Sequence, residues 1–188
     1  MNWKTALEKL KKGNESYCAD NLSSNRAKKE QRNSLTGGQQ PFAIILSCAD
    51  SRVAPEQIFD ADLGELFVIR VAGNVANTSS IASIEYAVAH LKTELIIVLG
   101  HESCGAVGAT LQGGDNGYNL NHLLSHIVPA VNQSNDSDVN TVVKKNAEIN
   151  AQSLKERSKI IEDAVNNGQC KIIPAYYALS DGSVSFFE

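Results

Sequence analysis

The stretch FAIILSCADSR, Phe42–Arg52, decides the fold, because an unbroken apolar run ends there in a short polar cluster. Apolar runs of this kind, bounded by turn formers, are typical of strands that are covered on both faces of a parallel sheet. Cys48, Asp50 and Arg52 follow the run, so they come where the buried strand is expected to end. Ligands of open α/β sheets bind just beyond the carboxyl ends of such strands. The sequence therefore predicts a binding site that begins at Cys48.

A second stretch, LGHESCG at Leu99–Gly105, repeats this pattern further along the chain. Its apolar run leads to His101 and Cys104, which are again metal-ligand side chains at an expected strand end. If the two strands are neighbours, Cys48 converges with this pair on one point. Two thiolates and one imidazole suit zinc, and three protein ligands leave a fourth position for water or a carboxylate. The alternative is that these residues are two core thiols and one hydrogen-bonded histidine.

Asp50 and Arg52 suggest the chemistry of this site. Asp50 is two residues from Cys48, close enough to reach the metal or its water, and a bidentate pair with Arg52 would keep the carboxylate ionised and off the zinc. If Asp50 were instead the fourth ligand, the site would be closed and structural. The other alternative is that Asp50 caps the following helix and Arg52 is a surface residue.

The chain resembles the β-class carbonic anhydrases, whose pattern is CxDxR followed by HxxC. CADSR and HESC carry this resemblance, with GELFVIRVAGN and SIEYAVAHL between them, and it extends from about Gln39 to Gly108. It implies zinc-dependent, reversible hydration of carbon dioxide to bicarbonate and a proton. Zinc would be held by Cys48, His101 and Cys104, and Asp50 and Arg52 would be the catalytic pair that orients the attack. Some members of the family also show a closed, inactive state in which the carboxylate binds zinc.

The resemblance also implies a set of substrate-binding residues. Gln39 matches a glutamine that donates to the substrate oxygen, and Gly105 matches a position whose backbone N–H can face the substrate. Phe67 and Tyr86 match aromatic residues that line the carbon dioxide pocket from the neighbouring subunit. Ala72 stands where plant-like members have valine, so it trims the apolar wall. The alternatives are that Gln39 is a polar loop residue and Gly105 a helix-start glycine. Phe67 and Tyr86 would then be ordinary core aromatics.

The order of the apolar segments predicts an α/β fold. Strands are expected at 42–47, 66–71 and 95–99, with helices between them, and this order favours right-handed crossovers and a parallel sheet. Further on, we expect a helix over 120–131 that is interrupted at Pro129, one long helix from about 139 to 165, and a hairpin of strands at 170–179 and 184–187. The predicted fold is a mostly parallel β-sheet flanked by helices, with a C-terminal antiparallel edge strand and an extended N-terminal helix.

A chain of 188 residues can bury one substantial core, so we expect a single domain over 1–188. Its parts are an N-terminal helical arm at 1–38, a zinc-site core at 39–111, and C-terminal helices and edge strands at 112–188. The amphipathic helix over 3–18 packs either on a partner subunit or on its own domain. The resemblance implies a homodimer or a dimer of dimers.

Composition and charge exclude several classes of partner. The formal net charge of −4 argues against binding to nucleic acid or to an anionic membrane, and the charged stretch at 26–32, of mixed sign, is typical of a solvated surface. No segment approaches the ~18 apolar residues of a membrane span, and the N-terminus lacks the apolar stretch of a signal peptide. We therefore expect a cytoplasmic protein.

Three other functions stay open beside carbon dioxide hydration. The same zinc site supports hydrolysis of carbon disulfide or carbonyl sulfide in relatives of the resembled family. A non-catalytic module that binds zinc or bicarbonate is the second, although Ile45 stands where members with a regulatory bicarbonate pocket have tryptophan. A nucleotide-binding α/β protein is the third, and the absence of GxGxxG or a P-loop after the first strand weighs against it.

Overall fold

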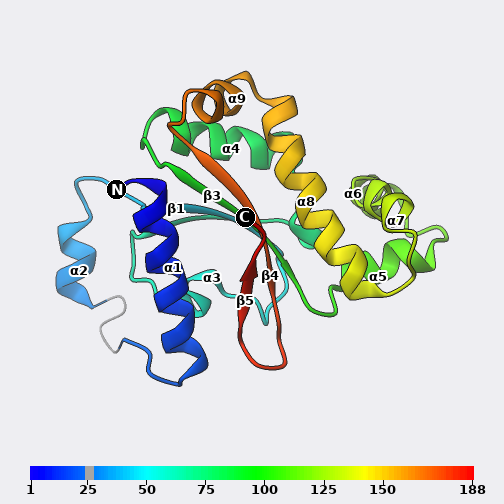
Figure 1. The fold of residues 1–188 in the computed structure, drawn as a ribbon, viewed down its shortest axis with the longest axis horizontal. Helices are drawn as coiled ribbons and strands as arrows, with labels where there is room; N and C mark the ends of the chain where they lie inside the picture. The colour runs from blue at the N-terminus through cyan, green and yellow to red at the C-terminus, as the bar shows by residue number, and fades with distance from the viewer. Residues whose placement is uncertain (24–27) are drawn as a thin grey trace.

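The structure, a computed structural model, describes residues 1–23 and 28–188. Within these ranges, five strands form one sheet in the order β2-β1-β3-β4-β5 (Figure 1). The first four run parallel, and β5 is antiparallel to β4. The predicted α/β fold is confirmed. The strands are β1 Ala43–Ser47, β2 Leu66–Arg70, β3 Leu95–His101, β4 Lys171–Tyr177 and β5 Val184–Phe186.

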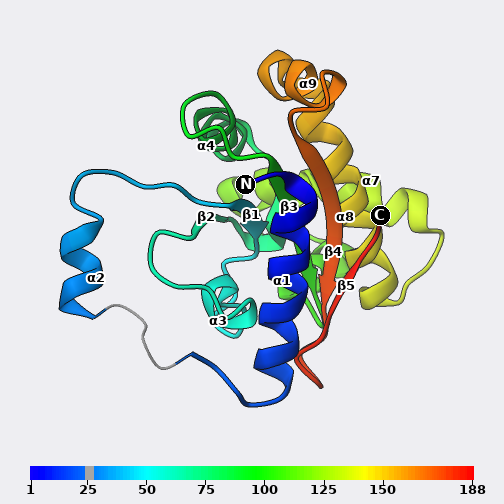
Figure 2. The same ribbon diagram turned by 60° about the vertical axis from the view of Figure 1, so that its left-hand side comes forward.

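Helices cover both faces of the sheet (Figures 1 and 2). Successive side chains of a strand point to opposite faces, and β1 shows this plainly because Ile45 packs in the core under α1 whereas Ile44 packs in the core under α4 and α8. This two-sided cover explains why the apolar runs of β1 and β3 are unbroken and fully buried. The helices on the two faces are α1 Trp3–Cys18 and α3 Pro55–Ile58 on one, and α4 Thr78–Ala89, α8 Val139–Arg157 and α9 Lys159–Asn166 on the other.

The N-terminal helix α1 packs on its own chain, which is the second of the two alternatives stated above. Asn14 anchors it: the Asn14 amide donates to the carbonyls of Ile58, at 3.2 Å, and of Gly182, at 2.8 Å. In return, the Val184 N–H donates to Asn14 Oδ1 at 2.8 Å. Gly13 allows this close approach, because a Cβ atom there would lie 1.9 Å from the Phe59 carbonyl oxygen.

Two helix predictions are wrong in their boundaries. The long helix expected from 139 to 165 is broken at Ser158, whose extended backbone (φ −133°, ψ 113°) begins α9. The Ile161 N–H donates to Ser158 Oγ, so Ser158 is the N-cap of α9. The segment expected at 120–131 is interrupted as predicted, but the break precedes Pro129 and separates α6 Tyr118–Ser125 from α7 Val128–Ser134. Proline lacks a backbone N–H and is tolerated in the first turn of a helix, so here it lies at the start of α7 rather than ending a helix.

The remaining elements are short: α2 Lys29–Ser34, the 3₁₀ turn η1 Ala72–Asn74 and α5 Gly105–Gln112. Figure 2 shows α2 standing off from the sheet, on the side of α3. Arg26 and its neighbours in the predicted charged stretch, up to residue 27, lie outside the described residues. Among the helices that the structure describes, none has the length and apolarity that crossing a bilayer requires.

Candidate metal centre

Three metal-ligand side chains meet at the carboxyl ends of β1 and β3. These strands are hydrogen-bonded neighbours in which Ser47 is level with Leu99, so Cys48 and His101 come out at the same edge of the sheet. Cys104 follows in the turn before α5. The ligand atoms of Cys48, His101 and Cys104 all lie within 4.8 Å of one another, and all three residues are buried. The structure therefore brings together the three side chains that the sequence predicts as zinc ligands.

The imidazole of His101 is oriented for coordination. Its Nδ1 lies 2.9 Å from the carbonyl oxygen of Glu102, so Nδ1 carries the proton and Nε2 keeps a free lone pair. The side chain is fully buried, and Nε2 has no hydrogen-bond partner among the described atoms. A buried polar atom without a partner is costly, and a cation between the three donors would remove that cost.

The two sulfurs act as a coupled pair. A hydrogen bond from Cys104 lowers the pKa of the Cys48 thiol to about 4, although burial opposes this shift. The same hydrogen bond and burial raise the pKa of Cys104. The Gly73 N–H also donates to Cys48 Sγ, at 3.3 Å. A pair that shares one proton in this way can exchange it for a divalent cation, as thiolate sites for zinc do.

Asp50 lies next to this cluster but is held by Arg52. The Arg52 guanidinium makes a bidentate pair with it: Nε donates to Oδ1 at 3.0 Å, and Nη2 donates to Oδ2 at 2.8 Å. These bonds hold the pKa of the Asp50 carboxyl well below its usual range. Asp50 Oδ2 lies 3.9 Å from His101 Nε2. The carboxylate is thus engaged with Arg52 rather than grouped with the three donors.

Arg70 is a supporting residue that the sequence analysis did not single out. It is the last residue of β2 and is level with Ser47 of β1. Its Nε donates to the Cys48 carbonyl at 2.9 Å, and its Nη2 donates to the Asp50 carbonyl. Arg70 therefore fixes the backbone that presents both side chains. The register of β2 against β1 brings Arg70 to this turn, and the sequence does not give that register directly.

Two buried asparagines of α8 support the turn after β2. The Asn146 amide donates to the Gly73 carbonyl at 2.8 Å, and the Ala76 N–H donates to Asn150 Oδ1 at 2.7 Å. They position Gly73, whose N–H faces Cys48. Asparagines four residues apart on the buried stripe of a helix were the available signal, because buried polar side chains need partners.

Two of the expected substrate-binding residues lie at the metal end of the sheet. Gly105 follows Cys104 and begins α5, and apart from its chain neighbours and the backbone of its own helix nothing lies within 4 Å of where its Cβ would be. It lines a hollow of about 310 Å³ together with Cys104 and Gly108. Ala72 starts η1, directly after Val71, whose N–H donates to the Ser47 carbonyl. Both residues therefore lie at the metal end of the sheet, and their roles toward a substrate stay predictions.

The other three expected substrate-binding residues, Gln39, Phe67 and Tyr86, lie at the opposite end of the sheet from this chain's own metal centre. Phe67 is level with Ile44, four residues before Cys48, which is about 13 Å along the strand. The Tyr86 ring lies 6.3 Å from the Phe67 ring. Gln39 is exposed and precedes β1, so it enters the sheet at this far end too. All three are therefore far from the metal centre of their own chain, and the expected action of Phe67 and Tyr86 from a neighbouring subunit stays a prediction.

The fold and the site together define an α/β protein with a cysteine–histidine–cysteine metal group at the carboxyl ends of a parallel sheet. The sequence model of the carbonic anhydrase family matches residues 43–184. The carbonic anhydrase of Mycolicibacterium smegmatis is 39% identical over 186 residues, covering 95% of this chain and 90% of the relative. Carbonic anhydrase 2 of Mycobacterium tuberculosis is 37% identical over 184 residues, covering 94% of this chain and 89% of the relative.

A solved structure shows the same fold. One of the tetrameric β-carbonic anhydrases of Sordaria macrospora superposes with a TM-score of 0.76 at 25% identity, covering 83% of this chain and 85% of that one. The chain belongs to the β-class carbonic anhydrase family. The resemblance stated from the sequence motifs is confirmed.

Proposed function

We propose that this protein is a zinc lyase that catalyses the reversible hydration of carbon dioxide to bicarbonate and a proton. One observation carries the proposal: three buried donors, Cys48, His101 and Cys104, lie within 4.8 Å of one another, beside an ionised carboxylate. Membership of the carbonic anhydrase family supports the reaction.

Zinc would be held by these three side chains. The donor set fits it, since two sulfurs and one imidazole nitrogen are preferred zinc ligands, and His101 Nε2, which has no hydrogen-bond partner within the described structure, offers a lone pair. When bound, zinc supplies a Lewis acid that lowers the pKa of water so that hydroxide is available near neutral pH. The N–H of Gly73 and the carbonyl of Glu102 hold two of the ligands in place.

Asp50 would orient the attacking oxygen. Its Oδ2 lies 3.9 Å from His101 Nε2, and this short distance supports a role in accepting a hydrogen bond from a metal-bound molecule. Arg52 keeps this carboxylate ionised and prevents it from turning onto the metal as a fourth ligand. The backbone at Gly105 and the small side chain of Ala72 would border the carbon dioxide, and Gly105 lines the hollow beside Cys104.

A second copy of the chain would complete the substrate pocket. Gln39, Phe67 and Tyr86 are far from their own metal centre, so a substrate role for them requires a partner's metal. Two features favour such an interface: β2 is a half-exposed edge strand, and 49% of the Tyr86 surface is exposed. We therefore propose a homodimer, or a dimer of dimers like the tetrameric Sordaria enzymes. If sedimentation showed a fully active monomer, these three residues would have no role in the site.

The cellular setting follows the same reasoning. All four cysteines are free thiols, which suits a reducing compartment, and we propose that the protein is cytoplasmic. Its negative charge disfavours nucleic acid and anionic membranes as partners. Carbon dioxide and bicarbonate are the expected small-molecule partners.

Zinc analysis combined with stopped-flow hydration of carbon dioxide tests the proposal. We expect one zinc per chain and hydration well above background. Stoichiometric zinc without hydration at any pH would instead indicate a non-catalytic zinc or bicarbonate module. Carbonyl sulfide and carbon disulfide measured on the same preparation discriminate the hydrolase, because a hydrolase would consume them in preference to carbon dioxide.

A further inference from the structure

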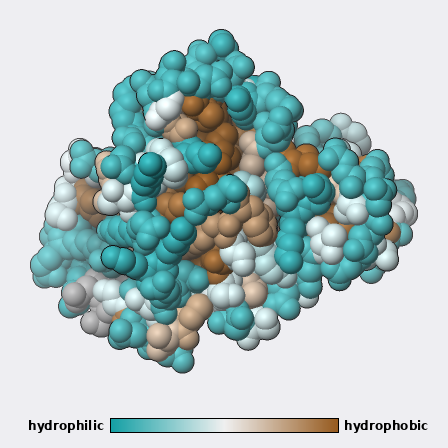
Figure 3. Space-filling view, viewed as in Figure 1, coloured by the Kyte–Doolittle hydropathy of each residue, from teal (hydrophilic) through white to brown (hydrophobic). Residues whose placement is uncertain are grey.

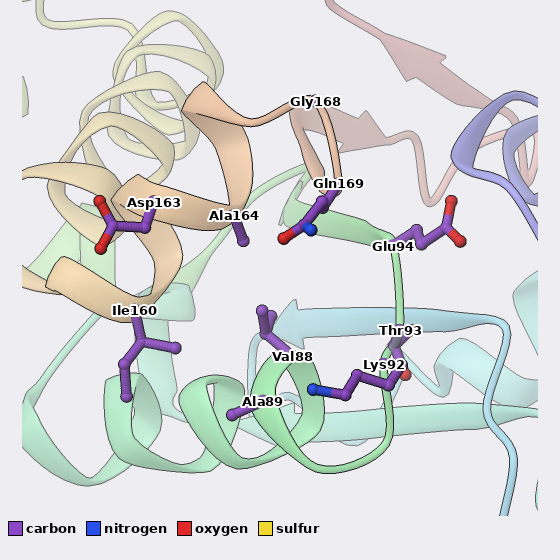
Figure 4. A pocket seen from close by; sticks show the side chains of 10 residues that line it. All are labelled: Val88, Ala89, Lys92, Thr93, Glu94, Ile160, Asp163, Ala164, Gly168 and Gln169. Carbon is purple, nitrogen blue, oxygen red and sulfur yellow. The ribbon is translucent and has the colours of Figure 1, made fainter.

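A hollow of about 570 Å³ lies at the end of the sheet opposite the metal centre (Figure 4). It is bounded by the C-terminal part of α4, by α9 and by the segments that lead into β3 and β4. Because β3 has seven residues, the hollow is about 20 Å from His101 along that strand. This volume is within the usual range of small-molecule sites, and the metal chemistry makes no use of it.

Lys92 supplies a positive charge inside the hollow. Figure 4 shows its side chain extended into the space beside Ala89. Lys92 Nζ has no ion-pair or hydrogen-bond partner among the described residues. Its backbone is left-handed, with φ +56°, a conformation that favours glycine. This left-handed residue ends the turn that follows α4, where the Thr93 N–H donates to the Ala87 carbonyl.

A second polar group points into the same space. In Figure 4 the Gln169 carboxamide is directed toward the hollow, and within the described part of the chain it makes no hydrogen bond. The two nearby carboxylates are directed elsewhere. Asp163 Oδ1 pairs with Lys159 Nζ at 2.8 Å, and Glu94 points away from the hollow. The charge that faces inward is therefore positive.

The rest of the hollow is apolar. Val88 and Ala164 face each other across it from α4 and α9, and Ile160 forms one side with 45% of its surface exposed. Figure 3 shows apolar surface between these two helices. The hollow thus combines a positive group and an amide donor with aliphatic side chains. This combination matches an anionic ligand with a hydrocarbon body.

We propose that this hollow is a binding site for a small aliphatic monocarboxylate. Its carboxylate would accept hydrogen bonds from Lys92 Nζ and from the Gln169 amide, and its hydrocarbon body would lie on Val88, Ile160 and Ala164. The site is separate from the metal centre and does not rest on the proposed reaction.

Titrations of the zinc-loaded protein with sodium hexanoate test the proposal. In ¹⁵N-edited NMR spectra, we expect shifts of the Gln169 side-chain amide and of the Gly168 and Ala89 backbone signals, with saturation. Hexanamide has the same shape without charge, and acetate has the charge without the body. Both should bind more weakly than hexanoate, and hexylammonium should not bind. Equal binding of hexanoate and hexanamide, preference for hexylammonium, or shifts confined to other residues would overturn the proposal.

Variants locate the site. Lys92→Gln should weaken hexanoate binding about fivefold, because a single charge pair near the surface contributes modestly. Lys92→Gly should weaken it similarly while it relieves the left-handed backbone, so a loss of fold cannot explain the result. Ile160→Ser should weaken hexanoate but not acetate, and Lys12→Gln, on α1, is the matched control and should change nothing. Unaltered affinity in both Lys92 variants would contradict the assignment.

Discussion

The two ends of the parallel sheet hold their polar side chains in different ways. At the carboxyl end, each functional group is fixed by a specific partner: Cys48 by the Gly73 N–H, His101 by the Glu102 carbonyl, and Asp50 by Arg52. At the amino end, the Lys92 and Gln169 side chains project into a hollow and have no hydrogen-bond or ion-pair partner among residues 1–23 and 28–188. Cys48 and His101 are buried, whereas Lys92 and Gln169 are exposed.

This difference follows from where the backbone leaves the sheet. Turns after β1, β2 and β3 converge at the carboxyl end, so carbonyls, N–H groups and Arg70 are available to orient one another. At the amino end, the incoming segments meet the C-terminal ends of α4 and α9 and leave a gap. Preorganised groups suit chemistry, because positioned dipoles need no reorganisation during the reaction. The comparison therefore predicts large effects of substitution at one end and small effects at the other.

The largest effect is expected from the ligands. Cys104→Ser removes one of three soft or borderline donors, so zinc should be lost and hydration should fall to background. Cys170→Ser is the matched control at the amino end, because Cys170 is also buried, and burial raises the pKa of its thiol to about 12. This control should keep full zinc content by elemental analysis. Equal zinc loss in Cys104→Ser and Cys170→Ser would contradict the predicted difference between the two ends of the sheet.

The next effect is expected from Asp50→Asn. The amide keeps the size of the side chain but loses the charge that Arg52 holds, so kcat should fall by roughly 10²-fold or more, as for loss of a positioned acid–base group. Zinc content should not change. Asp163→Asn, at the amino end, should retain kcat in the same stopped-flow assay. A zinc-loaded Asp50→Asn protein with full activity would remove Asp50 from the mechanism.

A smaller effect is expected from Arg70→Gln. This change removes the two hydrogen bonds to the carbonyls of Cys48 and Asp50, and supporting residues of metal sites typically contribute about 10- to 100-fold in affinity or activity. Arg70→Lys should restore little, because an ammonium cannot reproduce the planar fork of a guanidinium. Zinc affinity and kcat measured for both variants, with Lys92→Gln as the control, check this. Unchanged values would show that the turn holds its geometry without Arg70.

The pH dependence gives the smallest of these effects. Two thiolates offset the charge of zinc, which makes it a weaker Lewis acid than zinc held by three histidines, so hydration should rise with pH through about 7 to 9. Asp50 cannot be the source of this rise. Arg52 lowers the pKa of Asp50, so the carboxylate loses its charge only at acid pH, below its usual range. A flat profile from pH 6 to 9 would contradict this reasoning.

The motifs predicted the metal cluster because buried strands in a parallel sheet end at one edge, and Cys48 and His101 follow two such strands. The distance between Gln39 and the metal centre was harder to predict. Gln39 is only nine residues before Cys48 in sequence, yet the intervening strand carries the chain across the sheet. Sequence distance therefore did not show that Gln39 and its own metal centre are at opposite ends.

Other features depend on tertiary contacts that periodicity does not record. Ser158 fits the stripe of one long helix, but it caps α9 and donates to Glu85 of α4. An arginine at the end of a strand is usually on the surface, and only the register of β2 against β1 shows that Arg70 contacts the backbone at Cys48. The arrangement as a single domain and the roles of the substrate-binding residues stay predictions.

X-ray absorption at the zinc edge tests the central claim most directly, because it reports the atoms that surround the metal. If Cys48, His101 and Cys104 hold one zinc, the spectrum of the purified protein should fit two sulfurs at about 2.3 Å and two nitrogen or oxygen atoms at about 2.0–2.1 Å. In Asp50→Asn the same fit should hold, since Asp50 is paired with Arg52. A spectrum that fits no sulfur ligand or four sulfur ligands would contradict the account, and so would a purified protein that contains no zinc.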